Sequence, residues 1–123
     1  MPKSFTERRK LLKDANYLDL RPTKSYDHKD LEEGTVGVLV PKFGNWFTKT
    51  FFLPFSKADV VVIKLDKFGS ETWKLIDGKR DVGEICKILL DIFGDDIKPV
   101  EERITRFLTT LYEQRLISFV EIN

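Results

Sequence analysis

Three stretches of the chain have the hydrophobic pattern of β-strands. Val36, Val38 and Val40 recur at every second position of residues 34–41, which predicts a strand with one buried face. Residues 46–53 carry large apolar side chains on both faces and end at Pro54, which cannot donate to a ladder. Residues 59–65 are a β-branched run bounded by aspartates, which is typical of a well-covered strand.

The pattern then changes to helical spacing. Apolar residues from Phe68 to Ile76 predict a first helix, which Gly78 ends because glycine accepts the left-handed conformation. Asp81 and Glu84 have the spacing of a capping box and predict the start of a second helix. An amphipathic stripe over residues 98–115 predicts a third helix, and residues 117–122 predict a short final strand.

This order of elements predicts an α+β fold. We expect a winged-helix-like domain over residues 34–123, with a three-stranded antiparallel sheet followed by three helices and a short C-terminal strand. Residues 1–33 are more highly charged and are expected to form a separate arm, with a short helix over 5–12 and a polar link over 23–34. Either this arm is a poorly ordered tail, or residues 17–20 dock on the domain as an extended piece with Leu18 and Leu20 pointing the same way.

The predicted strand–helix–turn–helix region resembles a known family. Leu65-Asp66, followed by Asp77-Gly-x-x-x-Val82-x-x-Ile85, is similar to the core signature of the PqqD family, which is named for the pyrroloquinoline-quinone biosynthesis protein D. The resemblance extends over about residues 35–119. Asp66 stands where the family usually has asparagine, and either residue can cap the helix that follows.

The resemblance implies a peptide-binding module. In that family the leader of a ribosomally made precursor peptide is held as an added strand beside the third strand, in a groove against the third helix. The module presents the leader to a modifying enzyme, often a radical SAM protein. Carried over by position, the candidate peptide-binding residues are Val60, Val62, Lys64, Arg103, Arg106, Phe107 and Thr110.

Each candidate also has a structural interpretation. Val60 and Val62 could be covered by the N-terminal arm, and Arg103 and Arg106 could belong to a solvated helix face. If the final strand paired with the third strand, it would occupy the edge that a peptide needs. The large apolar groups on both faces of residues 46–53 are either covered by a terminal segment or form a patch for a partner.

Candidate catalytic groups are sparse in the sequence. His28 is the only histidine, so no His-centred metal site or catalytic triad can be assembled within the chain. Cys86 stands among apolar helical residues and is expected in the core. Trp73 is either a core anchor or part of a binding surface. We therefore expect a binding protein that has no enzymatic activity and needs no cofactor.

Charge and composition narrow the choice of partner. The net charge of the 123 residues is +1, which argues against nucleic acid as the main partner. A winged-helix DNA-binding protein is an alternative, but Glu101 and Glu102 counter Arg103 and Arg106 on its recognition helix. The chain has no apolar run of about 20 residues and no signal peptide, so a cytoplasmic protein without a membrane partner is expected.

A further alternative is an accessory or regulatory subunit that binds an enzyme directly. It does not exclude peptide capture. Because an exposed strand edge can pair with its own copy, either a monomer or a weak dimer is expected. The precursor peptide, the enzyme and the product cannot be named from these residues.

Overall fold

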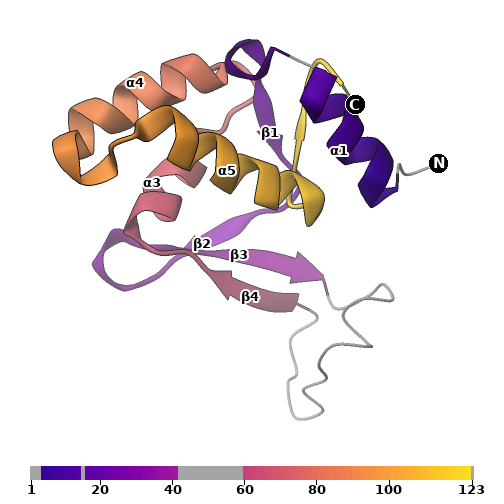
Figure 1. Ribbon diagram of the computed structural model, residues 1–123. Helices are drawn as coiled ribbons and strands as arrows, with labels where there is room; N and C mark the ends of the chain where they lie inside the picture. Colours follow the sequence, from indigo (N-terminus) through magenta and orange to yellow (C-terminus); the bar gives the residue numbers. More distant parts are fainter. Residues whose placement is uncertain (1–3, 15, 42–59, 123) are drawn as a thin grey trace.

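The computed structural model describes residues 4–14, 16–41 and 60–122 and confirms the α+β fold. Figure 1 shows a small sheet below two long helices, with a shorter helix between them. The helices are α1 (Phe5–Asp14), α3 (Lys67–Leu75), α4 (Val82–Phe93) and α5 (Val100–Glu113), with 3₁₀ turns η1 (Tyr17–Asp19), η2 (Glu32–Gly34) and η3 (Gly94–Ile97). The strands are β1 (Pro22–Lys24), β2 (His28–Asp30), β3 (Val36–Pro41), β4 (Val60–Lys64) and β5 (Ile117–Phe119).

The larger sheet has three antiparallel strands in the order β2-β3-β4. The predicted strands over 34–41 and 59–65 are confirmed as β3 and β4, with Val38 opposite Ile63 and Val40 opposite Val61. The strand predicted over 46–53 lies outside the described residues.

The remaining strand of this sheet, β2, lies within residues 23–34, which the hydrophobic pattern predicts to be a polar link. That prediction is wrong for Thr23 and Lys24, which belong to β1. It is also wrong for His28–Asp30, where Asp30 lies opposite Val36 of β3 and His28 opposite Val38. The strand is three residues long and polar, so it lacks the apolar alternation that sequence reasoning uses. Its backbone hydrogen bonds with β3 hold it in the sheet.

The predicted helices are present, although α5 (Val100–Glu113) is two residues shorter at each end than the predicted 98–115. Asp81 Oδ1 accepts the Glu84 amide at 2.8 Å, and Glu84 Oε1 accepts the Asp81 amide at 3.0 Å, so the capping box at the start of α4 is confirmed. Gly78 has a φ of 77°, as expected of the glycine after α3. Trp73 on α3 is fully buried, which makes it a core anchor, and Cys86 on α4 is also buried.

The predicted final strand is confirmed as β5, but its partner is β1. Phe119 lies opposite Pro22 and Ile117 opposite Lys24, in a separate two-stranded sheet. Both β5 residues are fully buried. The final strand therefore pairs with a strand from the N-terminal part of the chain. It does not pair with β4.

Residues 17–20 pack on the body of the protein, and their backbone forms a 3₁₀ turn. The extended conformation expected for this segment is wrong for Tyr17–Asp19. Leu20 is buried, and the Tyr17 hydroxyl lies 2.8 Å from Thr109 Oγ1 on α5. Arg8, on α1, is also buried and donates to the Tyr112 carbonyl at 2.6 Å, near the C-terminus of α5. Two N-terminal side chains thus anchor on α5.

Candidate functional site

The strand β4 lies at an edge of the three-stranded sheet. β3 is its neighbour on one side, and within the described ranges no strand is its neighbour on the other. β5, which could have covered this edge, pairs with β1. In the part of the chain that the structure describes, the edge named by the family resemblance is therefore open.

The backbone groups of β4 alternate between β3 and the open edge. The Leu65 amide donates to the Val36 carbonyl at 3.0 Å, so these two residues form a hydrogen-bonded pair. In an antiparallel ladder such pairs recur at every second residue, and the next one is Ile63 with Val38. The residues between them turn their N–H and C=O groups away from β3. Those residues are the three β4 candidates, Val60, Val62 and Lys64.

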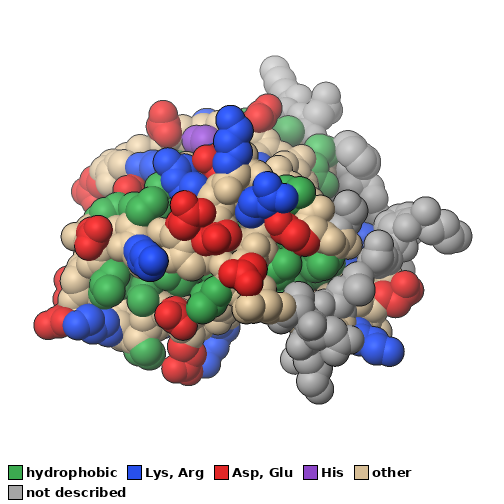
Figure 2. All heavy atoms as spheres, turned by 90° about the horizontal axis from the view of Figure 1, so that it is seen from above, with side chains coloured by type: hydrophobic (Ala, Val, Ile, Leu, Met, Phe, Trp, Pro, Cys, Tyr) green, Lys and Arg blue, Asp and Glu red, His purple; other side chains and the backbone are tan. Residues whose placement is uncertain are grey.

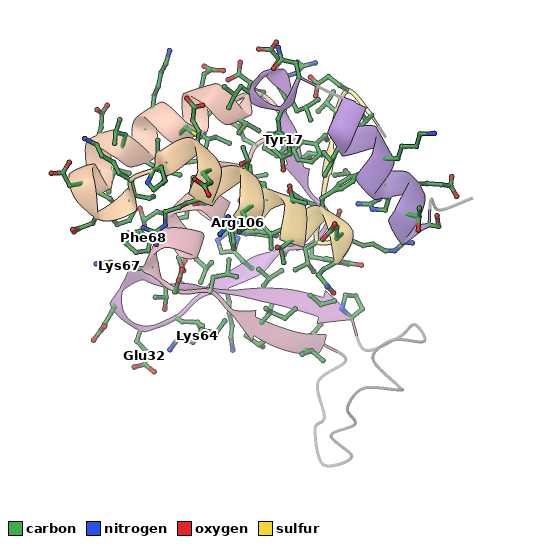
Figure 3. All side chains as sticks on the ribbon, viewed as in Figure 1. Tyr17, Glu32, Lys64, Lys67, Phe68 and Arg106 are labelled. Atoms are coloured by element: carbon green, nitrogen blue, oxygen red, sulfur yellow. The ribbon has the colours of Figure 1, made fainter. Side chains whose placement is uncertain are left out.

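The side chains of these three residues lie on the face of the sheet away from the core. Residues directly opposite each other in an antiparallel pair share a face, and Ile63 lies opposite the fully buried Val38. Val62 and Lys64 therefore point to the other face, where Val62 is 41% exposed. Figure 3 shows Lys64 below the sheet, on the side away from α5.

The α5 candidates lie on the opposite side of the sheet from those side chains. Arg103 places its guanidinium 5.1 Å from the centre of the Phe68 ring, and its Nη1 donates to the Asp96 carbonyl at 2.8 Å. Arg106 forms an exposed ion pair with Glu102 at 3.1 Å. If a strand were added beside β4, the β4 candidates would therefore contact its outer face and the α5 candidates its inner face. These two faces are called its outer and inner flanks below.

Thr110 is already engaged within α5, since its hydroxyl donates to the Arg106 carbonyl at 3.1 Å. A peptide in the groove would therefore meet its methyl group more readily than a free hydroxyl. On the sheet, Val61 and Ile63 turn their side chains toward the core and α5. Sequence reasoning omitted these two from the groove, although the same period-two rule places them on its inner flank.

A small hollow of about 140 Å³ lies where α3 meets α5. Phe107 lies directly over Gly69, because a Cβ built on that glycine would lie 3.0 Å from the Phe107 Cζ atom. Phe107 was among the candidates predicted from the sequence, but the α3 residues that line the hollow were not. The signal that could have pointed to them is Gly69, a glycine inside a predicted helix. The hollow is lined by Asp66, Phe68, Gly69, Thr72, Ile97, Arg103, Ile104 and Phe107.

The far side of α5 is covered by the N-terminal segment. The Tyr17 hydroxyl also lies 3.1 Å from the Thr105 carbonyl. Burial raises the pKa of Tyr17 to about 12, although the hydrogen bond with Thr109 opposes this change. The side of α5 that faces away from the proposed groove is therefore contacted by residues 1–33, which lie outside the predicted domain of residues 34–123.

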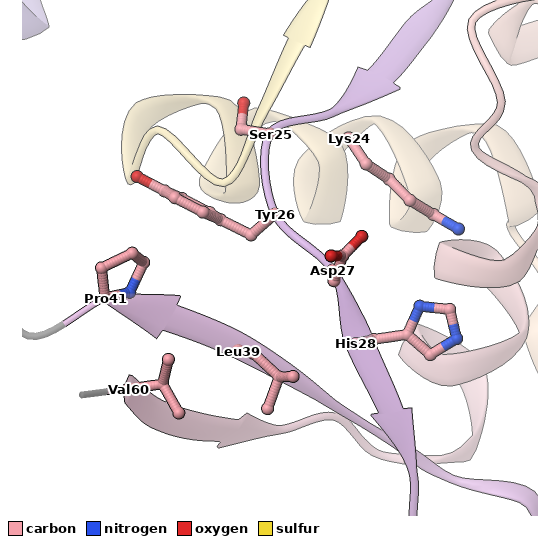
Figure 4. Close-up of a pocket in the computed structure, with 8 residues that line it drawn as sticks. All are labelled: Lys24, Ser25, Tyr26, Asp27, His28, Leu39, Pro41 and Val60. Atoms are coloured by element: carbon pink, nitrogen blue, oxygen red, sulfur yellow. The ribbon is translucent and has the colours of Figure 1, made fainter. Parts of the chain in front are cut away.

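A larger hollow, of about 510 Å³, lies near the end of β3 and the start of β4 (Figure 4). Leu39, Pro41 and Val60 line it from the strands, and the connection from β1 to β2 lines its other side. Its His28 ring is already engaged, since Nδ1 accepts a hydrogen bond from the Trp73 indole at 3.1 Å. Val60 therefore contributes to a different hollow from the one that Arg103 and Phe107 line.

Cys86 is unsuited to act as a nucleophile. Burial raises the pKa of its thiol to about 11, with a smaller contribution from Glu101. Among the described residues there is no group of three or more histidine, cysteine, aspartate or glutamate side chains placed to hold a metal ion. The described helices include none that is long and apolar enough to cross a membrane.

Comparison with known proteins identifies one family. Residues 57–117 match the sequence model of the family described as coenzyme PQQ synthesis protein D (PqqD). The matched segment begins just before β4 and ends at the first residue of β5. No match was found among curated proteins or among solved structures.

Proposed function

Since the chain belongs to the PqqD family, whose members take part in coenzyme PQQ synthesis, we propose that it is a non-catalytic protein that captures the leader of a ribosomally made precursor peptide. The leader adds as a strand to the open edge of β4, and the protein presents it to a modifying enzyme. A radical SAM enzyme is the partner class that the family resemblance favours. The observation that carries the proposal is that, among the described residues, no strand pairs with the outer edge of β4.

The edge offers a regular set of hydrogen-bonding groups. Three alternate residues, Val60, Val62 and Lys64, turn N–H and C=O groups toward the position of an added strand. Such a row gives affinity through the main chain, while side chains on the two flanks select among sequences. The outer flank would be formed by Val62 and Lys64.

The inner flank would be formed by α5 and the two inward-facing β4 residues. Val61 and Ile63 would contact alternate side chains of the leader, with Phe107, Arg103 and the methyl group of Thr110 on the helix opposite them. The hollow between α3 and α5 could take a small apolar side chain of the leader. Arg106 would lie at the solvent side, where its ion pair with Glu102 is exposed.

The charge distribution favours this function over nucleic-acid binding. Figure 2, which looks down on the helices, shows basic and acidic side chains interspersed without a broad basic area. On α5 itself, Glu101 and Glu102 precede Arg103 in the first turn. A recognition helix needs an excess of positive charge on its exposed face to neutralise phosphates.

A proline at the open edge tests the proposal. Replacing Val62 with proline removes an amide that no described residue uses and places a ring on the edge, so the fold should persist and peptide binding should be lost. Binding would be measured by amide NMR titration with short precursor-like peptides encoded near the gene. Val62→Ala is the matched control, since it shortens the same side chain and keeps the amide.

We expect the wild-type protein and Val62→Ala to show shifts in β4 and α5, and Val62→Pro to show none with its spectrum otherwise folded. Equal binding by all three proteins would exclude strand addition at this edge. If no peptide binds the wild-type protein but its signals broaden when a neighbouring enzyme is added, the direct enzyme-subunit function replaces leader capture.

A further inference from the structure

Lys64 occupies an unusual place in the sheet. Its partner on β3 is Gly37, and the partner of Gly37 on β2 is Lys29. The row therefore reads lysine, glycine, lysine across three strands, with both lysine side chains exposed on the same face. This row has no carboxylate of its own to balance the two charges.

The position beside Lys64 on β3 cannot supply an ion pair. Gly37 has no side chain, and the space where its Cβ would stand is filled by Val62, whose Cγ1 would lie 2.5 Å from it. Within the described ranges Lys64 forms no ion pair. Glu32, labelled near it in Figure 3, forms none with it either.

Positive charge continues beyond the end of β4. Lys67 lies three residues further on and places its ammonium group 5.2 Å from the centre of the Phe68 ring. Arg103 approaches the same ring from α5. Asp66, which follows β4 closely in the sequence, is occupied as the cap of α3, because its carboxylate accepts the Gly69 amide at 2.7 Å. This end of the edge thus carries cations on both flanks of the proposed strand position.

We infer that the strand that adds to β4 carries an aspartate or glutamate opposite Lys64, so that this protein selects leaders with a carboxylate at that position. The inference rests on the proposed function and adds a charge requirement at one position. The remaining neighbour of Lys64 in its row is the added strand, and a directly opposite pair of unlike charges is favourable. Because the pair is exposed to solvent, it would act mainly on selectivity.

A selection with random peptides tests this requirement without knowledge of the natural leader. The probe is a phage-displayed library of random 12-residue peptides, selected separately on the wild-type protein and on Lys64→Glu. Lys87→Glu, on the exposed side of α4, is the control with the same change in net charge. We expect the wild-type protein and the control to select an acidic residue at one fixed position, and Lys64→Glu to select lysine or arginine there.

A peptide selected on the wild-type protein is then synthesised with its acidic residue and with lysine in that place. We expect the wild-type protein to prefer the acidic form by about three- to tenfold and Lys64→Glu to reverse the preference, with both differences shrinking at high salt. Tight binding without any charge preference would overturn the inference and leave leader capture intact. Failure of every protein to select a peptide that competes for the β4 edge would overturn both.

Discussion

The indole Nε1 of Trp73 donates a hydrogen bond to Nδ1 of His28 at 3.1 Å, with the two rings nearly perpendicular. Trp73 is fully buried on α3, whereas His28 lies on β2, the strand that the sequence pattern does not reveal. The bond joins the helical layer to the sheet. It also gives the only histidine of the chain a structural partner.

Replacing His28 with alanine should therefore destabilise the fold. The buried indole N–H would lose its acceptor, and an unsatisfied buried donor costs about 1–3 kcal/mol. We expect the free energy of unfolding to fall by that amount, measured by denaturant unfolding followed by circular dichroism. Lys29→Ala is the control on the same short strand, because its side chain is exposed and should change stability by less than about 0.5 kcal/mol. Equal losses in the two variants would show that the hydrogen bond contributes nothing measurable.

The stability of the protein should depend on Tyr17 at high pH. Burial raises the pKa of Tyr17 to about 12, above its usual value of about 10, so the folded state favours the neutral phenol. The contribution of Tyr17 is therefore complete below about pH 10 and is lost as the pH rises toward 12. We expect a loss of about 2 kcal/mol over this range, measured by denaturant unfolding at successive pH values.

Tyr17→Phe isolates this effect from other groups that titrate in the same range. The variant loses the hydrogen bonds with Thr105 and Thr109 at all pH values, so it should be less stable than the wild-type protein at pH 8. Its stability should then fall less steeply between pH 10 and 12, and the two curves should converge. Parallel curves would show that the phenol ionises equally easily in the folded and unfolded chains.

Replacing Gly37 with alanine should disturb the outer face of the sheet. The new methyl group would lie 2.5 Å from Val62 Cγ1, closer than carbon atoms can approach, and 3.1 Å from Leu31 Cδ1, which is a tight contact. Val62 is β-branched and has few alternative rotamers, so either its side chain or the β3 backbone must shift. We expect this shift to lower the free energy of unfolding by about 1–3 kcal/mol. We expect a lower melting temperature and weaker binding of any peptide that uses the β4 edge.

The matched control is Gly83→Ala, in the first turn of α4. The new Cβ would have its nearest contacts at 3.4 Å, which is ordinary contact, and alanine favours a helix more than glycine does. This variant should be as stable as the wild-type protein or slightly more stable. If Gly37→Ala proved equally harmless, the packing of Val62 over Gly37 would be looser than the structure indicates.

The parts of the fold that could be predicted from the sequence have local signals. The alternating valines of β3 and the spacing of Asp81 and Glu84 each specify an element within a few residues. β2 could not be predicted in this way, since its stability comes from pairing with β3 and from the bond to Trp73, about 45 positions away. The choice of β1 as partner of β5 is likewise set by contacts between distant segments.

The candidate site shows the same division. The period-two rule correctly placed the side chains of Val60, Val62 and Lys64 on one face of β4, but their role in peptide binding stays a prediction. The direction of their amides follows only from the register with β3. The row of two lysines around a glycine depends on three strands at once, and no local pattern encodes it.

β5 pairs with β1, and β4 pairs with β3. The segment that matches the family model is therefore shorter than the part of the chain that folds together. The matched residues 57–117 contain β4 without β3, and they stop at the first residue of β5. Cut at those limits, the polypeptide would leave β4 without the strand that pairs with it and Ile117 without its β1 neighbour. Fusing this module to an enzyme, or producing it alone, would therefore require keeping the N-terminal segment as part of the module.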